Sequence, residues 1–371
     1  MTRGHTSNVG AASTIGLKTG KVLGVGTRSK QCKSCEQMGK QDKDSRRYKQ
    51  WAAKHKQYCT MNHDGSSGSM EGQIVKDIFS ESIQKHSLRY TRFIGDGDSN
   101  TFKTVSEAKP YGESVVIEKI ECVGHVQKRM GTRLRNLKKS MKGVKLEDGK
   151  TMFGRGRLTD VQIDKLQQMY GVAIRANKHN LAKMKQNVWA IYFHKMSTDA
   201  RPMHELCTAS CPYKVARQAK KVYSHKRSLP VAIMNKIKPI FKDLSNPVLL
   251  RKCLEGYTQN ANESFNNVVW RFCPKHKNHG LRVMNQAVSI ATAVFNDGAK
   301  AYGSVMKEMG LDVGPFAESC FADIDTERIK NAQRQALAAT KEARITMRQQ
   351  KKNQNELAAL REGVPYHPGA H

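Results

Sequence analysis

The 371-residue sequence is long enough for one large domain or two ordinary ones. Its 64 Lys and Arg against 32 Asp and Glu give a net charge of +32, which favours a nucleic-acid partner over a merely solvated cationic surface. No apolar run approaches the roughly 18 residues of a membrane-spanning helix, and no lipidation motif favours a membrane surface. Without a signal peptide, the nine Cys are expected to be reduced thiols or metal ligands.

The first 126 residues alternate stretches that favour strands with stretches that favour helices. Two β-favouring runs flank the turn residues 18–20, which predicts a hairpin. Ile74, Ile78 and Ile83 form an apolar stripe at helical spacing. In chain order, we predict a hairpin over residues 9–30, a charged insert over 31–64, a helix over 70–86, and strands over 88–95 and 114–126.

Most of the remaining chain shows helical patterns. Apolar residues recur at helical spacing from Met130 to Val144. The pattern continues from Leu158 to about Tyr257, with predicted breaks at Pro202, Pro212, Pro230, Pro239 and Pro247. Asn262 is the predicted N-cap of a further helix. The Ala-, Gln- and Lys-rich tail over residues 325–361 predicts a solvated or partner-dependent helix.

The charged insert carries a metal-binding pattern. Cys32 and Cys35 are two residues apart, so their thiolates can share one tetrahedral ion, and Cys59 with His63 completes a set of ligands. His55 is the alternative fourth ligand. Four protein ligands leave no open position, so the pattern predicts a structural Zn²⁺ that folds an insert too polar for a core of its own.

A second group of candidate ligands lies in the helical region. His204, Cys207 and Cys211 suggest another zinc site, and Cys273 and His276 are the candidates to complete it in space. Ordinary buried cysteines are the alternative interpretation.

Two carboxylates follow the strand predicted over residues 88–95. Asp96 and Asp98 are two positions apart, so both side chains can face one site, and hard oxygen ligands at a strand end suit Mg²⁺. A plain Asp–Gly turn is the alternative. Far along the chain, Glu263 lies on the helix that Asn262 is predicted to cap.

Three separated blocks resemble the Mutator-like transposase domain of invertebrate DNA elements: "RYTRFIGDGDSNTF", "ECVGHVQKRMGTRLRNLKK" and "QNANESFNNVVWRFCPK". The resemblance covers most of residues 3–294, including the insert. It implies a mixed α/β fold: a ribonuclease-H-like core with a zinc-binding insert and a large all-helical insertion. The implied divisions are a hairpin over 1–30, the zinc insert over 31–64, core helix and strands over 65–150, the helical insertion over 151–257, closing core helices over 258–310 and a basic helical tail over 311–371.

The resemblance also implies a catalytic Asp, Asp, Glu triad that holds Mg²⁺ or Mn²⁺ and acts on DNA by in-line displacement. Asp96 matches the second acid, with Asp98 as the nearby alternative, and Glu263 matches the third. Cys122 and His125 match a Cys-x-x-His signature, in which His125 orients a phosphate or a catalytic carboxylate. Packing in the core, or half of a metal site, is the alternative for this pair.

The family's first acid has no counterpart, because no Asp or Glu precedes Glu36. The opening strand of the core is missing too, so we expect the chain as written not to transpose. The alternative function is a non-catalytic, zinc-containing DNA-binding protein derived from a transposase. An RNA-binding protein is a third possibility, which the low aromatic content of 7% disfavours.

The resemblance implies a nuclear protein whose partner is double-stranded DNA, both transposon ends and target, and which forms homo-oligomers when active. No membrane or small-molecule substrate is expected. Basic side chains of the helix after residue 126 are the predicted phosphate contacts: Lys128, Arg129, Arg133, Arg135, Lys138 and Lys139.

Overall fold

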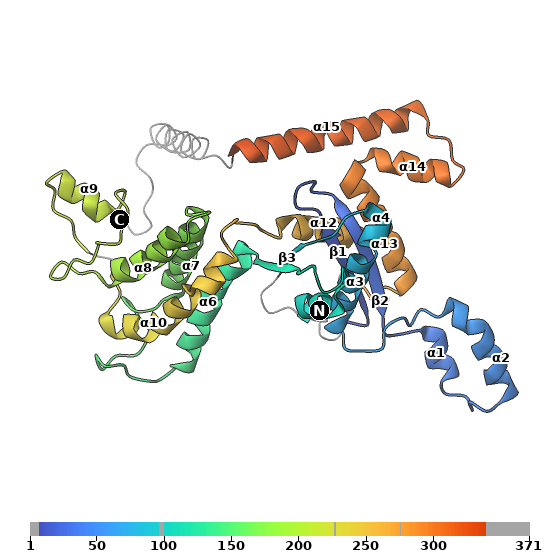
Figure 1. Ribbon diagram of the computed structural model, residues 1–371, viewed down its shortest axis with the longest axis horizontal. Coiled ribbons are helices and arrows are strands. Elements are labelled where there is room, and N and C mark those ends of the chain that lie inside the picture. The colour runs from blue at the N-terminus through green and yellow to red at the C-terminus, as the bar shows by residue number, and fades with distance from the viewer. Residues whose placement is uncertain (1–6, 96–99, 226–227, 275, 339–371) are drawn as a thin grey trace, which may run out of the picture. The chain divides into compact units, whose positions relative to one another are not determined.

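A computed structural model describes residues 7–95, 100–225, 228–274 and 276–338 (Figure 1). The chain forms two compact units, residues 1–288 and 289–371. Both helices and strands are present, so the expected mixed α/β class is confirmed. No helix in the described ranges is long and apolar enough to cross a membrane.

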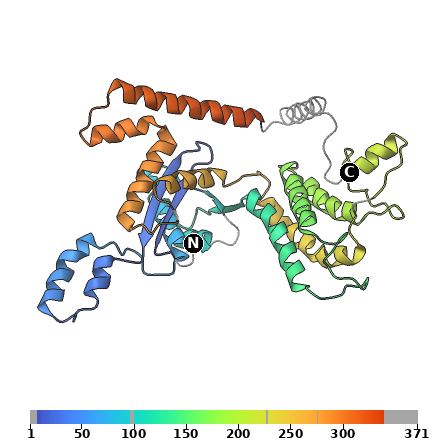
Figure 2. The ribbon, with the colours of Figure 1, turned by 180° about the vertical axis from the view of Figure 1, so that it is seen from behind.

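The predicted hairpin is confirmed as an antiparallel pair, β1 (Val9–Ile15) and β2 (Val22–Ser29). Gly20 in the connecting turn has φ +66°, a conformation that glycine adopts without strain. The two strands are drawn in dark blue in both views of the molecule (Figures 1 and 2).

The helix α3 (Ser69–Ser80) covers the hairpin through Ile74 and Ile78 of the predicted apolar stripe, whereas Ile83 lies beyond α3 and is exposed. A Cβ atom at Gly26 would lie 2.6 Å from the side chain of Ile74, so a glycine is required for this close approach of helix to sheet. The predicted helix over residues 70–86 is interrupted at Glu81 and continues as α4 (Ser82–His86).

A second sheet consists of two parallel strands, β3 (Arg92–Gly95) and β4 (Glu118–Glu121), which pair from Arg92 opposite Glu118 to Gly95 opposite Glu121. The helix α5 (Asn100–Ala108) lies between them in the chain. The strand predicted over residues 114–126 is therefore too long. Its last residues begin the helix α6 (Val123–Ser140), because the apolar residues Val123, Val126 and Met130 follow a helical rather than an alternating spacing.

The insert between the hairpin and α3 contains α1 (Lys33–Met38), α2 (Arg46–His55) and a 3₁₀ turn (Lys56–Tyr58). Neither α1 nor α2 has a buried residue. The insert is attached to the hairpin through Ser29, whose carbonyl accepts hydrogen bonds from the backbone N–H groups of Asn62 and His63 at 3.0 and 3.1 Å.

The large helical region forms its own apolar core (Figure 2). Its helices are α6, α7 (Asp160–Arg175), α8 (Leu181–Met196), α9 (Pro212–Gln218), α10 (Val231–Leu244) and α11 (Pro247–Arg251). Pro239 was a predicted break but lies inside α10. The helix continues through it because Ile237 and Phe241, on either side, are both fully buried in this core.

The first of the predicted closing core helices is α12 (Asn260–Phe272), and its N-cap is Gln259 rather than the predicted Asn262. Phe265 and Val269 are its buried residues. The helix α13 (Leu281–Asp297) follows. The second unit contains α14 (Lys300–Glu308) and α15 (Pro315–Ala338), so the predicted tail helix begins earlier than residue 325, and its part beyond Ala338 lies outside the described residues.

Candidate active site and metal centres

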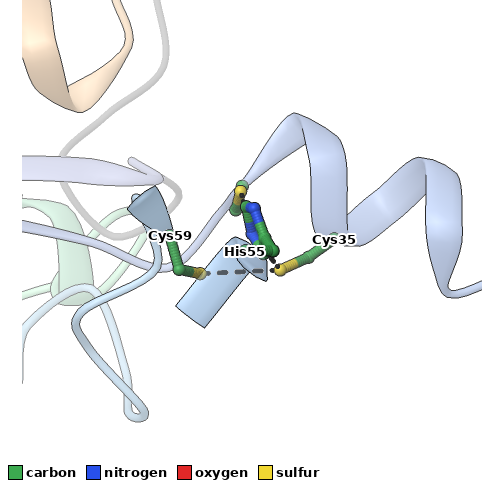
Figure 3. Close-up of side chains that lie close together, drawn as sticks. Cys35, His55 and Cys59 are labelled. Atoms are coloured by element: carbon green, nitrogen blue, oxygen red, sulfur yellow. Dashed lines mark hydrogen bonds between the residues drawn. The ribbon is translucent and has the colours of Figure 1, made fainter. Parts of the chain in front are cut away.

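The first group of metal ligands lies at the base of the insert (Figure 3). Cys32, Cys35, His55 and Cys59 each offer one ligand atom, and these atoms all lie within 4.8 Å of one another. The Nε2 atom of His55 is 3.3 Å from Sγ of Cys32 and 3.2 Å from Sγ of Cys35, and the Sγ atoms of Cys35 and Cys59 are 3.5 Å apart. A tetrahedral zinc ion requires sulfur–nitrogen separations of about 3.5 Å and sulfur–sulfur separations of about 3.8 Å, so this donor set fits Zn²⁺.

The surroundings of this group also suit a structural zinc. The indole of Trp51 stacks on His55 with ring centroids 4.6 Å apart, which fixes the imidazole plane. Burial acts to raise the pKa of the Cys32 thiol, but hydrogen bonds from Thr60 and Cys35 together outweigh it and bring the pKa down to about 5. Burial raises the pKa of Cys35 to about 12, with further increases from Cys59 and Cys32. Since the helices of the insert bury no residue, the cluster takes the place of an apolar core.

The fourth ligand in this group is His55, the alternative in the sequence, and His63 is not part of it. The Nε2 atom of His63 instead lies 3.2 Å from the carbonyl oxygen of Ser66 and 3.0 Å from Oγ of Ser69. His55 reaches the thiols because it is the last residue of α2. His63 lies further along the chain, where its backbone N–H is bonded to Ser29 of the hairpin.

A second group joins His204, Cys207 and Cys211 with His194, a residue that the sequence did not single out. These side chains come from the last turn of α8 and from the segment that follows it. Among the described residues, neither Cys273 nor His276 takes part in a metal-ligand group. The donor set of two imidazoles and two thiols fits a structural zinc ion.

The carboxyl ends of β3 and β4 meet the beginning of α12. The side-chain amide of Gln259, the N-cap of α12, donates to the carbonyl oxygen of Ile94 in β3 at 3.1 Å. Its backbone N–H donates to Sγ of Cys122, directly after β4, at 3.3 Å. The backbone N–H of Val123 also donates to the carbonyl of Tyr257 at 3.0 Å. One residue therefore attaches α12 to the ends of both parallel strands.

Glu263 lies in the first turn of α12, one turn after this attachment. Its side chain is 60% exposed, and Oε1 lies 3.9 Å from Nζ of Lys128 in α6. Asp96 directly follows Gly95, the last residue of β3. Asp96 and Asp98 themselves lie outside the described residues.

The Cys-x-x-His pair lies at the junction of β4 and α6 rather than within a strand. Cys122 is the N-cap of α6 and is buried, with its sulfur accepting the hydrogen bond from Gln259. His125 lies in the first turn of α6, and its Nδ1 atom is buried without a hydrogen-bond partner in the described part of the chain. Neither residue belongs to the two metal-ligand groups found among the described residues.

Most of the predicted phosphate contacts of α6 are paired with acids of the chain. Arg129 donates to the buried carboxylate of Glu121 at 2.8 Å, and its own side chain is largely covered. The other pairs are exposed on at least one side: Lys128 with Glu263, Arg133 with Asp243, Arg135 with Asp164, and Lys138 with Asp160. Lys139 is exposed. Exposed pairs stabilise a protein by at most about 1 kcal/mol, so DNA phosphates can replace the acids in these pairs. Arg129 is instead paired with a buried acid and stabilises the fold.

The hairpin, the covering helix, the parallel pair and the insert with its Cys₃His group all lie within residues that a known family shares. A family model described as Mutator-like transposase matches residues 1–212 of the 371, more than half of the chain. The chain belongs to the Mutator-like transposase family. No curated protein and no solved structure matches it.

The matched part of this Mutator-like transposase contains both metal-ligand groups and the ends of β3 and β4. It does not contain α12, so the position of Glu263 depends on the contacts of Gln259 and Lys128. Spacing within the chain predicts local ligand sets, whereas Glu263 is brought to the strands by hydrogen bonds between distant segments.

Proposed function

We propose that this Mutator-like transposase binds double-stranded DNA and carries, in a ribonuclease-H-like core, two acids of a site for metal-assisted phosphoryl transfer, although the chain as written lacks the first acid and is not expected to transpose. The observation that carries the proposal is the attachment of α12 by Gln259 to the carboxyl ends of both β3 and β4. It brings Glu263, more than a hundred residues away in the chain, to the edge where Asp96 follows β3. Ligand-binding residues in sheets with parallel strands gather at such carboxyl ends.

Asp96 and Glu263 are the proposed ligands of Mg²⁺ or Mn²⁺, with Asp98 as the alternative to Asp96. The exposed carboxylate of Glu263 fits a hard cation that retains water and meets a phosphate. Such a cation activates the attacking oxygen and stabilises the leaving oxygen. Lys128, 3.9 Å from the Glu263 carboxylate, would contact a phosphate beside this site, and the imidazole of His125, in the first turn of α6, would orient a phosphate oxygen.

The partner of this site is proposed to be duplex DNA, because a net charge of +32 favours a polyanion that releases counterions on binding. Transposon ends and target DNA in the nucleus are the corresponding substrates and location, and self-association would accompany activity. A non-catalytic DNA-binding protein derived from a transposase has the same charge and the same zinc insert. The two functions differ in whether Mg²⁺ participates in the complex with DNA.

The test is the affinity of the full chain for a DNA duplex in Mg²⁺ and in EDTA at equal ionic strength. We expect Mg²⁺ to strengthen binding by the wild-type chain, because the ion screens the acids from the phosphates. Glu263→Gln should bind equally well in both solutions, and should bind more tightly than the wild type in EDTA. Glu308→Gln, an exposed acid of α14, is the matched control and should behave as the wild type.

Binding that is tight but independent of Mg²⁺ in both the wild type and Glu263→Gln would support the non-catalytic function instead. Preference for an RNA duplex over the DNA duplex at fixed salt would contradict both functions. The test measures the contribution of the metal to binding, so it does not require the first acid of the family's triad.

A further inference from the structure

The segment between α8 and α10 carries a group of ligands that is independent of the proposed active site. We propose that His194, His204, Cys207 and Cys211 bind a second structural Zn²⁺, which folds residues 197–225 into a zinc knuckle at the end of α8. His194 binds through Nδ1 from the last turn of α8, and the other ligands come from the segment itself.

The distances between the donor atoms match one tetrahedral ion. Bond lengths of about 2.0–2.1 Å to nitrogen and 2.3 Å to sulfur require about 3.3 Å between two nitrogens and about 3.5 Å between nitrogen and sulfur. The Nδ1 atoms of His194 and His204 are 3.2 Å apart. Sγ of Cys207 lies 3.7 Å from each of these nitrogens, and Sγ of Cys211 lies 3.7 and 3.5 Å from them.

A hydrogen-bond chain behind His204 fixes the tautomer that a metal requires. Nε2 of His204 lies 2.9 Å from Nε2 of His225, and Nδ1 of His225 lies 2.5 Å from a carboxylate oxygen of Asp199. Because the carboxylate accepts the proton of His225 Nδ1, Nε2 of His225 is left as an acceptor for the N–H of His204, and Oγ of Ser197, 2.8 Å from the same Nε2, is a second possible acceptor. Nδ1 of His204 is then unprotonated and faces the ligand group. Asp199 therefore supports His204 through His225, one residue further out than in the usual carboxylate–histidine–zinc arrangement.

The described part of this segment buries few side chains. Its ends meet where the backbone N–H of Leu229 donates to the carbonyl of Lys195 at 2.8 Å. Between them, the described residues that are buried are Ser197, His204 and Cys211, two of which are ligands. The ring of Tyr213 covers His204, with centroids 4.1 Å apart. Because so few apolar side chains are buried here, the free energy of metal binding would supply much of what orders the segment, together with the contacts of Tyr213, Tyr223 and His225.

The first test is the zinc content of the purified full chain after removal of loosely bound metal. We expect two zinc ions per chain in the wild type and one in the double variant Cys207→Ser, Cys211→Ser. Cys320→Ser, an exposed cysteine outside both groups, should retain two. A zinc content that is the same in the wild type and in the folded double variant would overturn the proposal.

A second variant keeps the proposal testable if the double variant does not fold. His194→Cys exchanges one proposed ligand for another, so zinc should remain bound. The wild type has five thiolate ligands, three in one group and two in the other, and the variant has six. After replacement of zinc by Co²⁺, the thiolate-to-cobalt absorption of the variant should therefore be higher than that of the wild type by about one fifth. An unchanged spectrum at full Co²⁺ occupancy would mean that residue 194 is not a ligand. Neither readout involves DNA or Mg²⁺, so failure here leaves the proposed function intact, and the reverse also holds.

Discussion

Replacing Arg129 separates its role in the fold from its predicted role in binding DNA. The guanidinium lies 2.8 Å from the carboxylate of Glu121, whose side chain is only 6% exposed, at the end of β4. The variant Arg129→Met keeps most of the length of the side chain and removes the charge. The carboxylate then stays buried without its cation, which is unfavourable in a medium of low polarity.

Breaking a buried ion pair from one side costs about 3–5 kcal/mol. We expect the lower end, about 3 kcal/mol, because the Arg129 side chain is 21% exposed and water partly screens the pair. The double variant Glu121→Gln, Arg129→Met removes both charges and should lose only about 1–2 kcal/mol, the value of the hydrogen bond. The coupling energy between the two positions should therefore exceed about 1 kcal/mol.

The assay is urea unfolding of the zinc-loaded full chain, combined with the salt dependence of DNA affinity. Arg129→Met should leave the slope of log affinity against log salt unchanged. Lys139→Ala, an exposed neighbour on α6, is the control and should change stability by less than about 0.5 kcal/mol. Two results together would refute the reasoning: a decrease in the free energy of unfolding of less than about 0.5 kcal/mol in Arg129→Met, and a salt slope reduced by about one unit. They would mean that Arg129 contacts DNA.

Three further predictions concern stability, pH and DNA. Tyr170→Phe should lower the free energy of unfolding by about 1 kcal/mol, because the buried hydroxyl donates to a carbonyl at the end of α10 at 2.8 Å; no loss would contradict this. The hydrogen bond from Arg157 lowers the pKa of Asp148, so its stabilisation is present above the unfolded-state pKa and is lost as pH falls through the lowered value. Asp148→Asn should therefore be less stable than wild type at pH 7 by urea unfolding, and a difference that does not shrink below about pH 4 would contradict the assignment. Finally, Arg217, Lys220 and Lys221 are exposed and have no ion pair with an acid in the described residues. Their joint replacement by Ala should reduce the slope of log DNA affinity against log salt by about three units. An unchanged slope would mean that they do not contact the phosphates.

Local patterns predicted the parts of the fold that depend on neighbouring residues. The hairpin and α3 follow from turn chemistry and apolar spacing, and both are confirmed. The boundary at Cys122 was missed because apolar residues continue from the buried strand into a buried helix, where spacing is ambiguous. Pro239 was misread because a proline disfavours a helix locally, whereas the core on both sides of it stabilises one.

The candidate sites show the same limit. The close spacing of Cys32 and Cys35 reveals a ligand pair, but the choice between His55 and His63 depends on where α2 ends. His194 was missed because it lies in an apolar helix, ten residues before the next ligand. A histidine in the last turn of a helix that precedes a His-x-x-Cys-x-x-x-Cys segment is the signal that could have identified it.

Iron-directed cleavage of the chain tests the central claim most directly. Fe²⁺ occupies oxygen-ligand sites of Mg²⁺ and, with ascorbate and peroxide, releases radicals that cut the backbone beside its ligands. In the complex with DNA, we predict cuts near residues 96 and 263 that excess Mg²⁺ suppresses and that Glu263→Gln or Asp96→Asn abolishes. Cuts that survive Asp98→Asn would assign the second acid to Asp96. The absence of cuts at both places, or their persistence in Glu263→Gln, would contradict a metal site at the ends of β3 and β4.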